Sequence, residues 1–197
     1  MGDEYGIVKV AAVQAESVFL DREGSTEKAC RLIREAGKAG ARIIGFPEGF
    51  IPAHPVWYHH HAATGAIANK LAVELFKNSV EIPGPQTDAL CAAARDANAY
   101  VVIGVCEKIP NTIGTMYNSQ LYIGPDGTLI RKHQKIMPTV GERLAGQRID
   151  VPRLQVAAGR RALRLDDQLL DDLGIDRLVV KETARDAAVD GFKNVHV

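Results

Sequence analysis

A strand–helix–strand pattern near the N-terminus constrains the fold of this chain more than any other feature. Residues 7–14 (IVKVAAVQ) form an apolar run that predicts a buried strand. Apolar residues recur at helical spacing from Ser25 to Lys38, so a helix with Ser25 as N-cap is expected there. Residues 41–46 (ARIIGF) predict a second strand, which Pro47 ends. Strand, helix and strand with short connections are typical of a βαβ unit, so we expect an α/β fold.

Two further helices are expected in the next part of the chain. Ile67, Leu71 and Leu75 form one apolar stripe at helical spacing. The segment Pro83-Gly84-Pro85 ends that helix, and Thr87 is expected to cap the following one.

A strand and a β-hairpin should follow these helices. Residues 100–106 (YVVIGVC) are rich in β-branched side chains and predict a buried strand. Residues 118–123 and 128–131 flank the turn Gly124-Pro125-Asp126-Gly127, whose residues favour a tight reversal. The sheet is therefore expected to become antiparallel at this hairpin.

The character of the sequence changes near Leu144. From residue 145 to 197 there is no Cys, Met, Trp or Tyr, whereas Arg and Asp are frequent. Residues 168–175 predict a short helix and residues 177–180 a short strand. We therefore divide the chain into a domain spanning residues 1–144 and a divergent tail spanning residues 145–197.

Composition restricts the class of protein. A chain of 197 residues that is 46% hydrophobic can bury a core, and its formal net charge of zero does not favour nucleic acid or an anionic membrane as partner. No apolar run is long enough to span a bilayer, and the N-terminus lacks the basic and apolar regions of a signal peptide. Three cysteines are too few and too scattered for a disulfide framework, so a cytoplasmic protein is expected.

Glu48 is a candidate general base. It follows the predicted strand at residues 41–46 and is framed by Phe46, Phe50 and Trp57. A carboxylate at the carboxyl end of a strand and partly shielded from water is suited to proton transfer near neutral pH. The alternative is an exposed or helix-capping loop glutamate.

Lys135 and Glu142 are weaker candidates. Lys135 follows the predicted hairpin, where an ammonium group near a carboxylate can stabilise a developing negative charge. The alternative is an ordinary solvated lysine. Glu142 has a corresponding alternative, a surface ion pair with Arg143 or Lys135.

The loop at residues 54–61 combines histidines with aromatic side chains. Consecutive His59, His60 and His61 cannot all face one ion, and they have no acidic or cysteine partner at metal spacing, so no metal site is expected. Trp57 and Tyr58 are better candidates for the walls of a pocket.

The cysteines are expected to be structural. Cys30 and Cys91 fall near the apolar stripes of predicted helices, and Cys106 ends a predicted strand with no histidine nearby. All three are interpreted as core residues.

Taken together, these segments resemble the nitrilase superfamily of carbon–nitrogen hydrolases, and its nitrilase branch more than its amidase or carbamoylase branches. The matching segments, in chain order, are VKVAAVQ at 8–14, FPEGFIP at 46–52, LFKNSV at 75–80, YNS at 117–119, HQKIMPT at 133–139 and GER at 141–143. The resemblance covers about residues 6–144.

The resemblance implies an α-β-β-α sandwich and a Glu-Lys-Cys catalytic triad that needs no cofactor and no metal. It assigns the general base to Glu48, the lysine that stabilises the tetrahedral intermediate to Lys135, and the second glutamate to Glu142. In such enzymes a cysteine thiolate attacks a nitrile, and hydrolysis then gives ammonia and a carboxylic acid. Trp57, Tyr58 and His54 would line the pocket for the small-molecule nitrile.

The nucleophile implied by the resemblance has no counterpart here. No cysteine follows Cys106, and the segment expected to hold the nucleophile reads RLDDQLLDDL at residues 164–173. We therefore expect an incomplete sandwich whose tail comes from a truncation, a frame change or a fusion, and a chain with little or no activity.

Alternatives to an inactive nitrilase stay open, and an activity of the amidase or carbamoylase type within the same superfamily is among them. Another is a working hydrolase that recruits Cys106 or a cysteine from another chain. A third is a non-catalytic binding or assembly module, because members of the superfamily commonly form homo-oligomers and a remnant could join related subunits.

Overall fold

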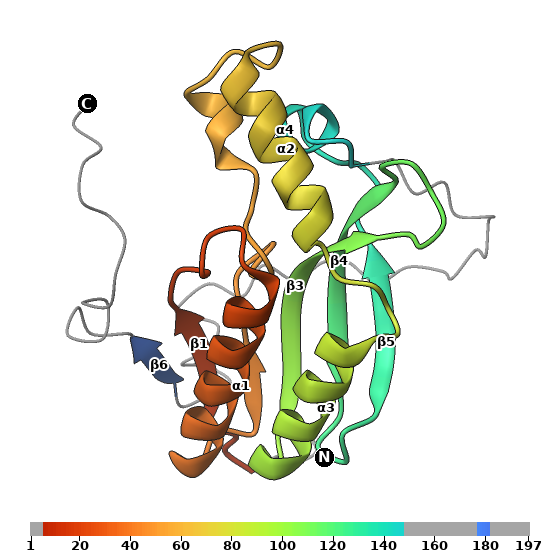
Figure 1. Cartoon of the computed structure of the whole chain (residues 1–197). Coiled ribbons are helices and arrows are strands. Elements are labelled where there is room, and N and C mark those ends of the chain that lie inside the picture. The colour runs from red at the N-terminus through yellow and green to blue at the C-terminus, as the bar shows by residue number, and fades with distance from the viewer. Residues whose placement is uncertain (1–5, 148–176, 182–197) are drawn as a thin grey trace, which may run out of the picture.

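One mixed β-sheet organises the chain. The computed structural model describes residues 6–147 and 177–181. Its strands follow the order β5-β4-β3-β2-β1-β6 across the sheet (Figure 1). Their bounds are β1 (Val10–Gln14), β2 (Ile43–Gly45), β3 (Tyr100–Lys108), β4 (Met116–Ile123), β5 (Leu129–Gln134) and β6 (Arg177–Lys181).

The strand directions confirm the predicted change from parallel to antiparallel pairing. β1 pairs in parallel with β2 and β6, and β2 pairs in parallel with β3. β4 runs antiparallel to both β3 and β5, which is the predicted hairpin. The β4–β5 register shifts between Tyr122 and Ile123, so the pairing on either side of this irregularity is set separately.

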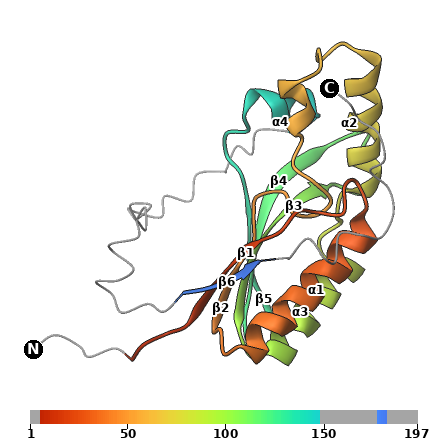
Figure 2. The ribbon, with the colours of Figure 1, turned by 90° about the vertical axis from the view of Figure 1, so that its left-hand side faces the viewer.

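Helices cover one face of the sheet. Their bounds are α1 (Arg22–Lys38), α2 (Ala66–Asn78), α3 (Pro85–Ala97) and α4 (Val140–Leu144), with a 3₁₀ helix η1 at Val56–His59. Figure 2 shows α1 and α3 side by side on a single face, whereas α2, η1 and α4 gather beyond the end of β2. The main core lies between the sheet and the α1–α3 pair, and includes Ile33, Ile44, Leu90, Ile103 and Leu121.

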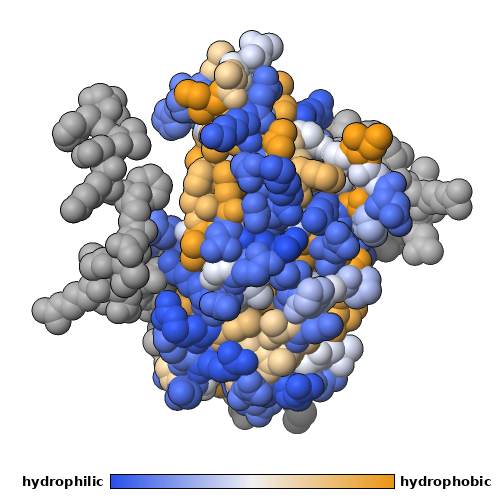
Figure 3. All heavy atoms as spheres, in the orientation of Figure 1, coloured by the Kyte–Doolittle hydropathy of each residue, from blue (hydrophilic) through white to orange (hydrophobic). Residues whose placement is uncertain are grey.

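In the described part of the chain, no helix covers the opposite face of the sheet along β2 and β3 (Figure 2). Ile43 is 42% exposed and Tyr100 is 50% exposed, and the two are paired neighbours on β2 and β3. Figure 3 shows the other, helix-covered side, where hydrophilic residues dominate the outer surfaces of α1 and α3. The described residues thus form one helix layer and one sheet layer, which confirms the predicted α/β class and the incomplete sandwich.

The first helix begins earlier than the sequence pattern predicted. α1 starts at Arg22, and its N-cap is Asp21, whose carboxylate accepts a hydrogen bond from the backbone N–H of Gly24. Ser25 is not the cap, because its hydroxyl donates to the carbonyl of Val18 and so secures the preceding loop. Asp21 and Ser25 are both residue types that favour the N-cap, so the sequence alone does not fix this boundary.

Thr87 contributes to a cap from a different position. α3 begins at Pro85 with Gly84 as N-cap, and Thr87 is the third residue of the helix. Its hydroxyl accepts a hydrogen bond from the N–H of Gly84 at 2.9 Å, which is the reciprocal half of a capping box. The predicted helix start is confirmed, and Thr87 caps the helix from its third position.

The strand predicted at residues 177–180 is confirmed as β6, which lies beside β1 at the edge of the sheet. The helix predicted at residues 168–175 lies outside the described residues. Among the described residues, no helix combines the length and apolar character needed to cross a membrane.

Candidate active site

Glu48 lies just beyond the carboxyl end of β2, as predicted. The chain turns at Gly49, whose φ of +62° favours glycine, and passes closely over β3. A Cβ at Gly104 of β3 would lie 2.8 Å from the Cα of Glu48, so Gly104 leaves the room for this turn. The Glu48 side chain is 50% exposed, which corrects the expectation that aromatic residues shield it.

Glu142 is fully buried, so the ion pair that it forms with Lys135 is not the surface pair considered as the alternative. It lies in α4 as the third residue of the helix, and its Oε2 accepts a hydrogen bond from the backbone N–H of Thr139. The same glutamate therefore closes a capping box and points its other oxygen, Oε1, toward the site. Local sequence provides the cap, and tertiary packing buries it.

Lys135 links the two carboxylates. Its Nζ lies 2.7 Å from Oε1 of Glu48 and 3.0 Å from Oε1 of Glu142. The lysine follows β5, and its backbone N–H donates to the carbonyl of Asn118 on β4. Lys135 is therefore held at both its backbone and its side chain, unlike the solvated lysine considered as the alternative.

Asn118 is a site residue that sequence reasoning missed. Its Nδ2 lies 2.5 Å from Oε1 of Glu48 and 2.5 Å from Oε1 of Glu142, so one amide group donates to both carboxylates. The residue belongs to the family-like segment at residues 117–119, which was the one available signal. We call Glu48, Asn118, Lys135 and Glu142 the carboxylate–lysine cluster.

The pKa values of two members reflect this arrangement. Burial by itself lowers the pKa of Lys135, but hydrogen bonds and charge attraction to Glu48 and Glu142 outweigh it, so the pKa is raised. Burial by itself raises the pKa of Glu142. Hydrogen bonds from the Thr139 N–H, the Lys135 ammonium and the Asn118 amide outweigh burial and lower the pKa to about 2. Both groups therefore carry their charge at neutral pH.

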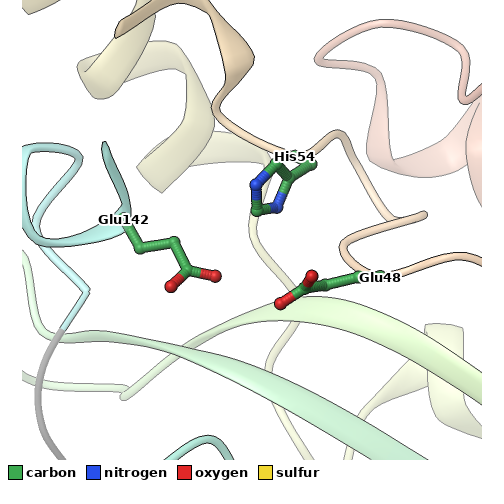
Figure 4. A group of neighbouring side chains, drawn as sticks. All are labelled: Glu48, His54 and Glu142. Carbon is green, nitrogen blue, oxygen red and sulfur yellow. The ribbon is translucent and has the colours of Figure 1, made fainter. Parts of the chain in front are cut away.

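His54 lies beside the cluster with a donor set that a metal ion could use. Ligand atoms of Glu48, His54 and Glu142 all lie within 4.8 Å of one another, and Figure 4 shows the two carboxylates pointing toward each other with the imidazole beside them. The Lys135 ammonium already bridges the same carboxylate oxygens, Oε1 of each. A metal ion would compete with the ammonium group for these oxygens, so the cluster is better described as two carboxylates bridged by a lysine.

A cavity of about 310 Å³ opens next to the cluster. It is lined by three cluster members, by other residues of β3, β4 and β5, and by the segment that follows β2, namely Phe46, Glu48, Gly104, Asn118, Ser119, Gln120, His133 and Lys135. This volume suits a small molecule.

Trp57 and Tyr58 do not belong to this lining. Trp57 is 4% exposed and packs in a second apolar cluster with Leu75 and Met116. The Tyr58 hydroxyl donates to the carbonyl of Leu144 at 2.9 Å and so connects η1 to the helix that carries Glu142. His54 alone among the three predicted pocket residues lies near the carboxylates.

Cys106 lies close to the cluster, but its thiol is buried and unreactive. It pairs with Asn118 across β3 and β4, is 1% exposed, and donates its thiol hydrogen to the carbonyl of Ala53 at 3.4 Å. Burial, reinforced by the negative charge of Glu142, raises the pKa of the Cys106 thiol to about 12. Cys30 is also buried and Cys91 is partly buried, in agreement with a structural role for all three.

A lysine that bridges a buried and a half-exposed carboxylate at the carboxyl ends of β2 and β5 combines a group able to transfer protons with a group able to stabilise negative charge. The chain belongs to the carbon–nitrogen hydrolase family, whose model matches residues 9–188. The match extends past Leu144 and includes β6. The division into residues 1–144 and 145–197 stays a prediction.

Curated relatives carry nitrilase names. The chain is 40% identical over 153 residues to "Nitrilase 2" of an unknown prokaryotic organism, covering 78% of this chain and 48% of that protein. It is 40% identical over 139 residues to "Nitrilase" of Bacillus sp. (strain OxB-1), covering 71% of this chain and 39% of that protein. The chain therefore spans about half the length, or less, of these relatives.

Solved structures support the fold. An amidase from Nesterenkonia sp. matches with a TM-score of 0.51 and 16% identity, over 72% of this chain and 48% of that chain. An N-terminal amidase matches with a TM-score of 0.52 and 18% identity, over 72% of this chain and 31% of that chain. At this level of identity the similarity concerns the fold alone.

Proposed function

We propose that this chain carries the acid–base half of a nitrilase-type site, and that by itself it does not hydrolyse nitriles. The carboxylate–lysine cluster supports the first part, because Lys135 and Asn118 each donate hydrogen bonds to both Glu48 and Glu142. The missing thiolate supports the second part, because the covalent step has no nucleophile.

Each cluster member has a role in the proposed reaction. Glu48 is the general base, since its half-exposed carboxylate borders the cavity and can take a proton from a nucleophile or water. Lys135 and Asn118 are hydrogen-bond donors at the same position and would stabilise negative charge on the nitrile nitrogen or on a tetrahedral oxygen. Glu142 keeps Lys135 protonated and in place.

The complete reaction requires a thiolate. Attack of the sulfur on the nitrile carbon forms a C–S bond and, with one proton, a thioimidate. Water then adds to this carbon and ammonia leaves, giving a thioester, and a second water releases the carboxylic acid and restores the thiol. Cys106 does not fit this role, because its thiol is buried and its pKa is about 12.

Substrate binding gives a direct test of the proposed site. Phenylacetonitrile or a simple aliphatic nitrile should shift the NMR signals of the Asn118 side-chain amide, and Lys135→Met should remove that shift. Ammonia release should stay at background in the same samples. Turnover that disappears in Glu48→Gln would overturn the proposed inactivity, and unshifted Asn118 signals would overturn nitrile binding. Running the corresponding amides in parallel tests the amidase or carbamoylase alternative.

A second candidate function is assembly with related subunits or with another copy of this chain. The partly exposed Ile43 and Tyr100 on the open sheet face favour it, because apolar side chains on paired strands are typical of a covered surface. Light scattering should then give a mass above that of one chain. A monomer that also fails to bind full-length nitrilases would remove this candidate.

Three unpaired cysteines suit the cytoplasmic location that we propose.

A further inference from the structure

A second buried glutamate lies on the opposite face of the strands that carry the cluster. Glu107 of β3 is 1% exposed. Its carboxylate accepts hydrogen bonds from Ser119 Oγ at 2.6 Å, from Gln134 Nε2 at 2.9 Å and from Lys132 Nζ at 2.5 Å. One side chain of β3 is thus bonded to two residues of β5 and one of β4.

Two of these donors are the chain neighbours of cluster residues. Ser119 follows Asn118 on β4, and Gln134 precedes Lys135 at the end of β5. Successive side chains of a strand point to opposite faces of the sheet. When Glu107 binds Ser119 and Gln134 on the helix side, Asn118 and Lys135 are therefore turned toward the site.

The register of these strands decides whether the cluster can form. Ser119 pairs with Gln134, and the N–H of Lys135 donates to the carbonyl of Asn118 at 2.7 Å. Slipping a strand by one residue would exchange its two faces and turn Asn118 or Lys135 away from Glu48. The irregularity at Tyr122 and Ile123 separates this end of the hairpin from the turn, so the turn alone does not fix the pairing here.

We propose that Glu107 is a positioning residue, which fixes the register of β3, β4 and β5 so that Asn118 and Lys135 converge on Glu48 and Glu142. It touches neither the cavity nor the reacting groups. The inference rests on the role proposed above for the carboxylate–lysine cluster. The positions of Asn118 and Lys135 can nevertheless be tested without any turnover.

A simpler role for Glu107 is to neutralise Lys132, whose side chain is 30% exposed. The two roles make different demands on the carboxylate. Neutralising Lys132 requires only the negative charge, whereas positioning requires an acceptor for Ser119 and Gln134. Lys132→Met and Glu107→Gln separate these demands, because the first removes the ion pair and the second keeps an acceptor oxygen.

The test compares Glu107→Ala, Glu107→Gln, Lys132→Met and Gln134→Leu in the full chain. The readouts are the NMR signals of the Lys135 ammonium group and of the Asn118 side-chain amide. The control is Glu81→Ala, which removes an exposed ion-pair partner of Lys108 at 3.6 Å on the same strand. Neither readout requires catalysis, so absence of nitrile hydrolysis leaves the result interpretable.

Glu107→Ala is expected to return the raised pKa of Lys135 toward its ordinary 10.5 and to shift the Asn118 amide. In Glu107→Gln at least half of the elevation of the Lys135 pKa should remain, and the Asn118 amide should shift by at most half as much as in Glu107→Ala. Lys132→Met and Glu81→Ala should leave both signals at their wild-type positions. If Glu107→Ala does not fold, Gln134→Leu decides, since it should shift Lys135 more than Asn118. Unchanged Lys135 and Asn118 signals in folded Glu107→Ala, or in Gln134→Leu, would overturn the proposal.

Discussion

The ammonium nitrogen of Lys135 lies 2.7 Å from Oε1 of Glu48, although 87 positions separate the two residues in the chain. Glu48 follows β2 and Lys135 follows β5, and two other strands lie between these in the sheet. Their contact therefore depends on the register of the whole β2–β5 region.

Removing the lysine should destabilise the chain, because Glu142 would stay buried with its charge and lose one donor. For Lys135→Met we expect a loss of about 1.5–3 kcal/mol in the free energy of unfolding at pH 7, measured with urea. Lys77→Met is the matched control, since it removes an ion pair with Glu74 whose lysine side chain is 61% exposed. That change should cost less than about 1 kcal/mol. Equal losses in the two variants would contradict the role of Lys135.

Acid should weaken the fold through Glu142. Its pKa is held at about 2 in the folded chain, below the ordinary 4.5. A carboxyl group with a lowered pKa stabilises the fold above its unfolded pKa, and this contribution is lost as the pH falls through the folded pKa. Stability should therefore fall between pH 4.5 and pH 2. The slope should be smaller in Glu142→Gln, and parallel urea-stability curves for the two proteins would count against this assignment.

Gly104 should not tolerate a side chain. A Cβ there would lie 2.6 Å from the backbone nitrogen of Gly49 and 2.8 Å from the Cα of Glu48, so the turn that carries the general base would have to move. Gly104→Ala should cost about 1–3 kcal/mol of stability and displace the Lys135 ammonium signal. Gly45→Ala is the control, because its nearest neighbouring atom, the carbonyl oxygen of Ala11, would be 4.0 Å away. A folded Gly104→Ala with wild-type stability would refute the close approach.

The cysteines should differ in reactivity. Burial raises the pKa of Cys106 to about 12, so its thiolate is rare at neutral pH, whereas Cys91 is only partly buried. Iodoacetamide should modify Cys91 at least about a hundredfold faster than Cys106 in the folded chain. Peptide mapping by mass spectrometry measures both rates. Rapid labelling of Cys106, with an activity lost in parallel, would revive the hypothesis that it acts as a nucleophile.

Local patterns were sufficient for most of the secondary structure. The βαβ unit, the hairpin and the short strand at residues 177–180 were predicted from apolar periodicity and turn residues, because these patterns reflect which side of an element is buried. Helix starts were less accurate. Asp21 and Ser25 are both good capping residues, and only the path of the preceding loop decides between them.

The candidate site was predicted less completely than the fold. The resemblance pointed to Glu48, Lys135 and Glu142, but no sequence pattern showed that Asn118 donates to both carboxylates. Trp57 and Tyr58 were expected at the pocket because they are large and aromatic. The structure places Trp57 in an apolar cluster and bonds Tyr58 to α4, which depends on how η1 packs against that helix.

The sequence by itself determined the family and the absence of any cysteine after Cys106, since both follow from the order of residues along the chain. Tertiary structure alone decided that Lys135 bridges a pair of carboxylates and that Glu107 faces the opposite side of the same strands. The physical reason is that hydrogen bonds and ion pairs act over a few ångströms. Which distant residues come that close is set by strand order and register, which no short stretch of sequence contains.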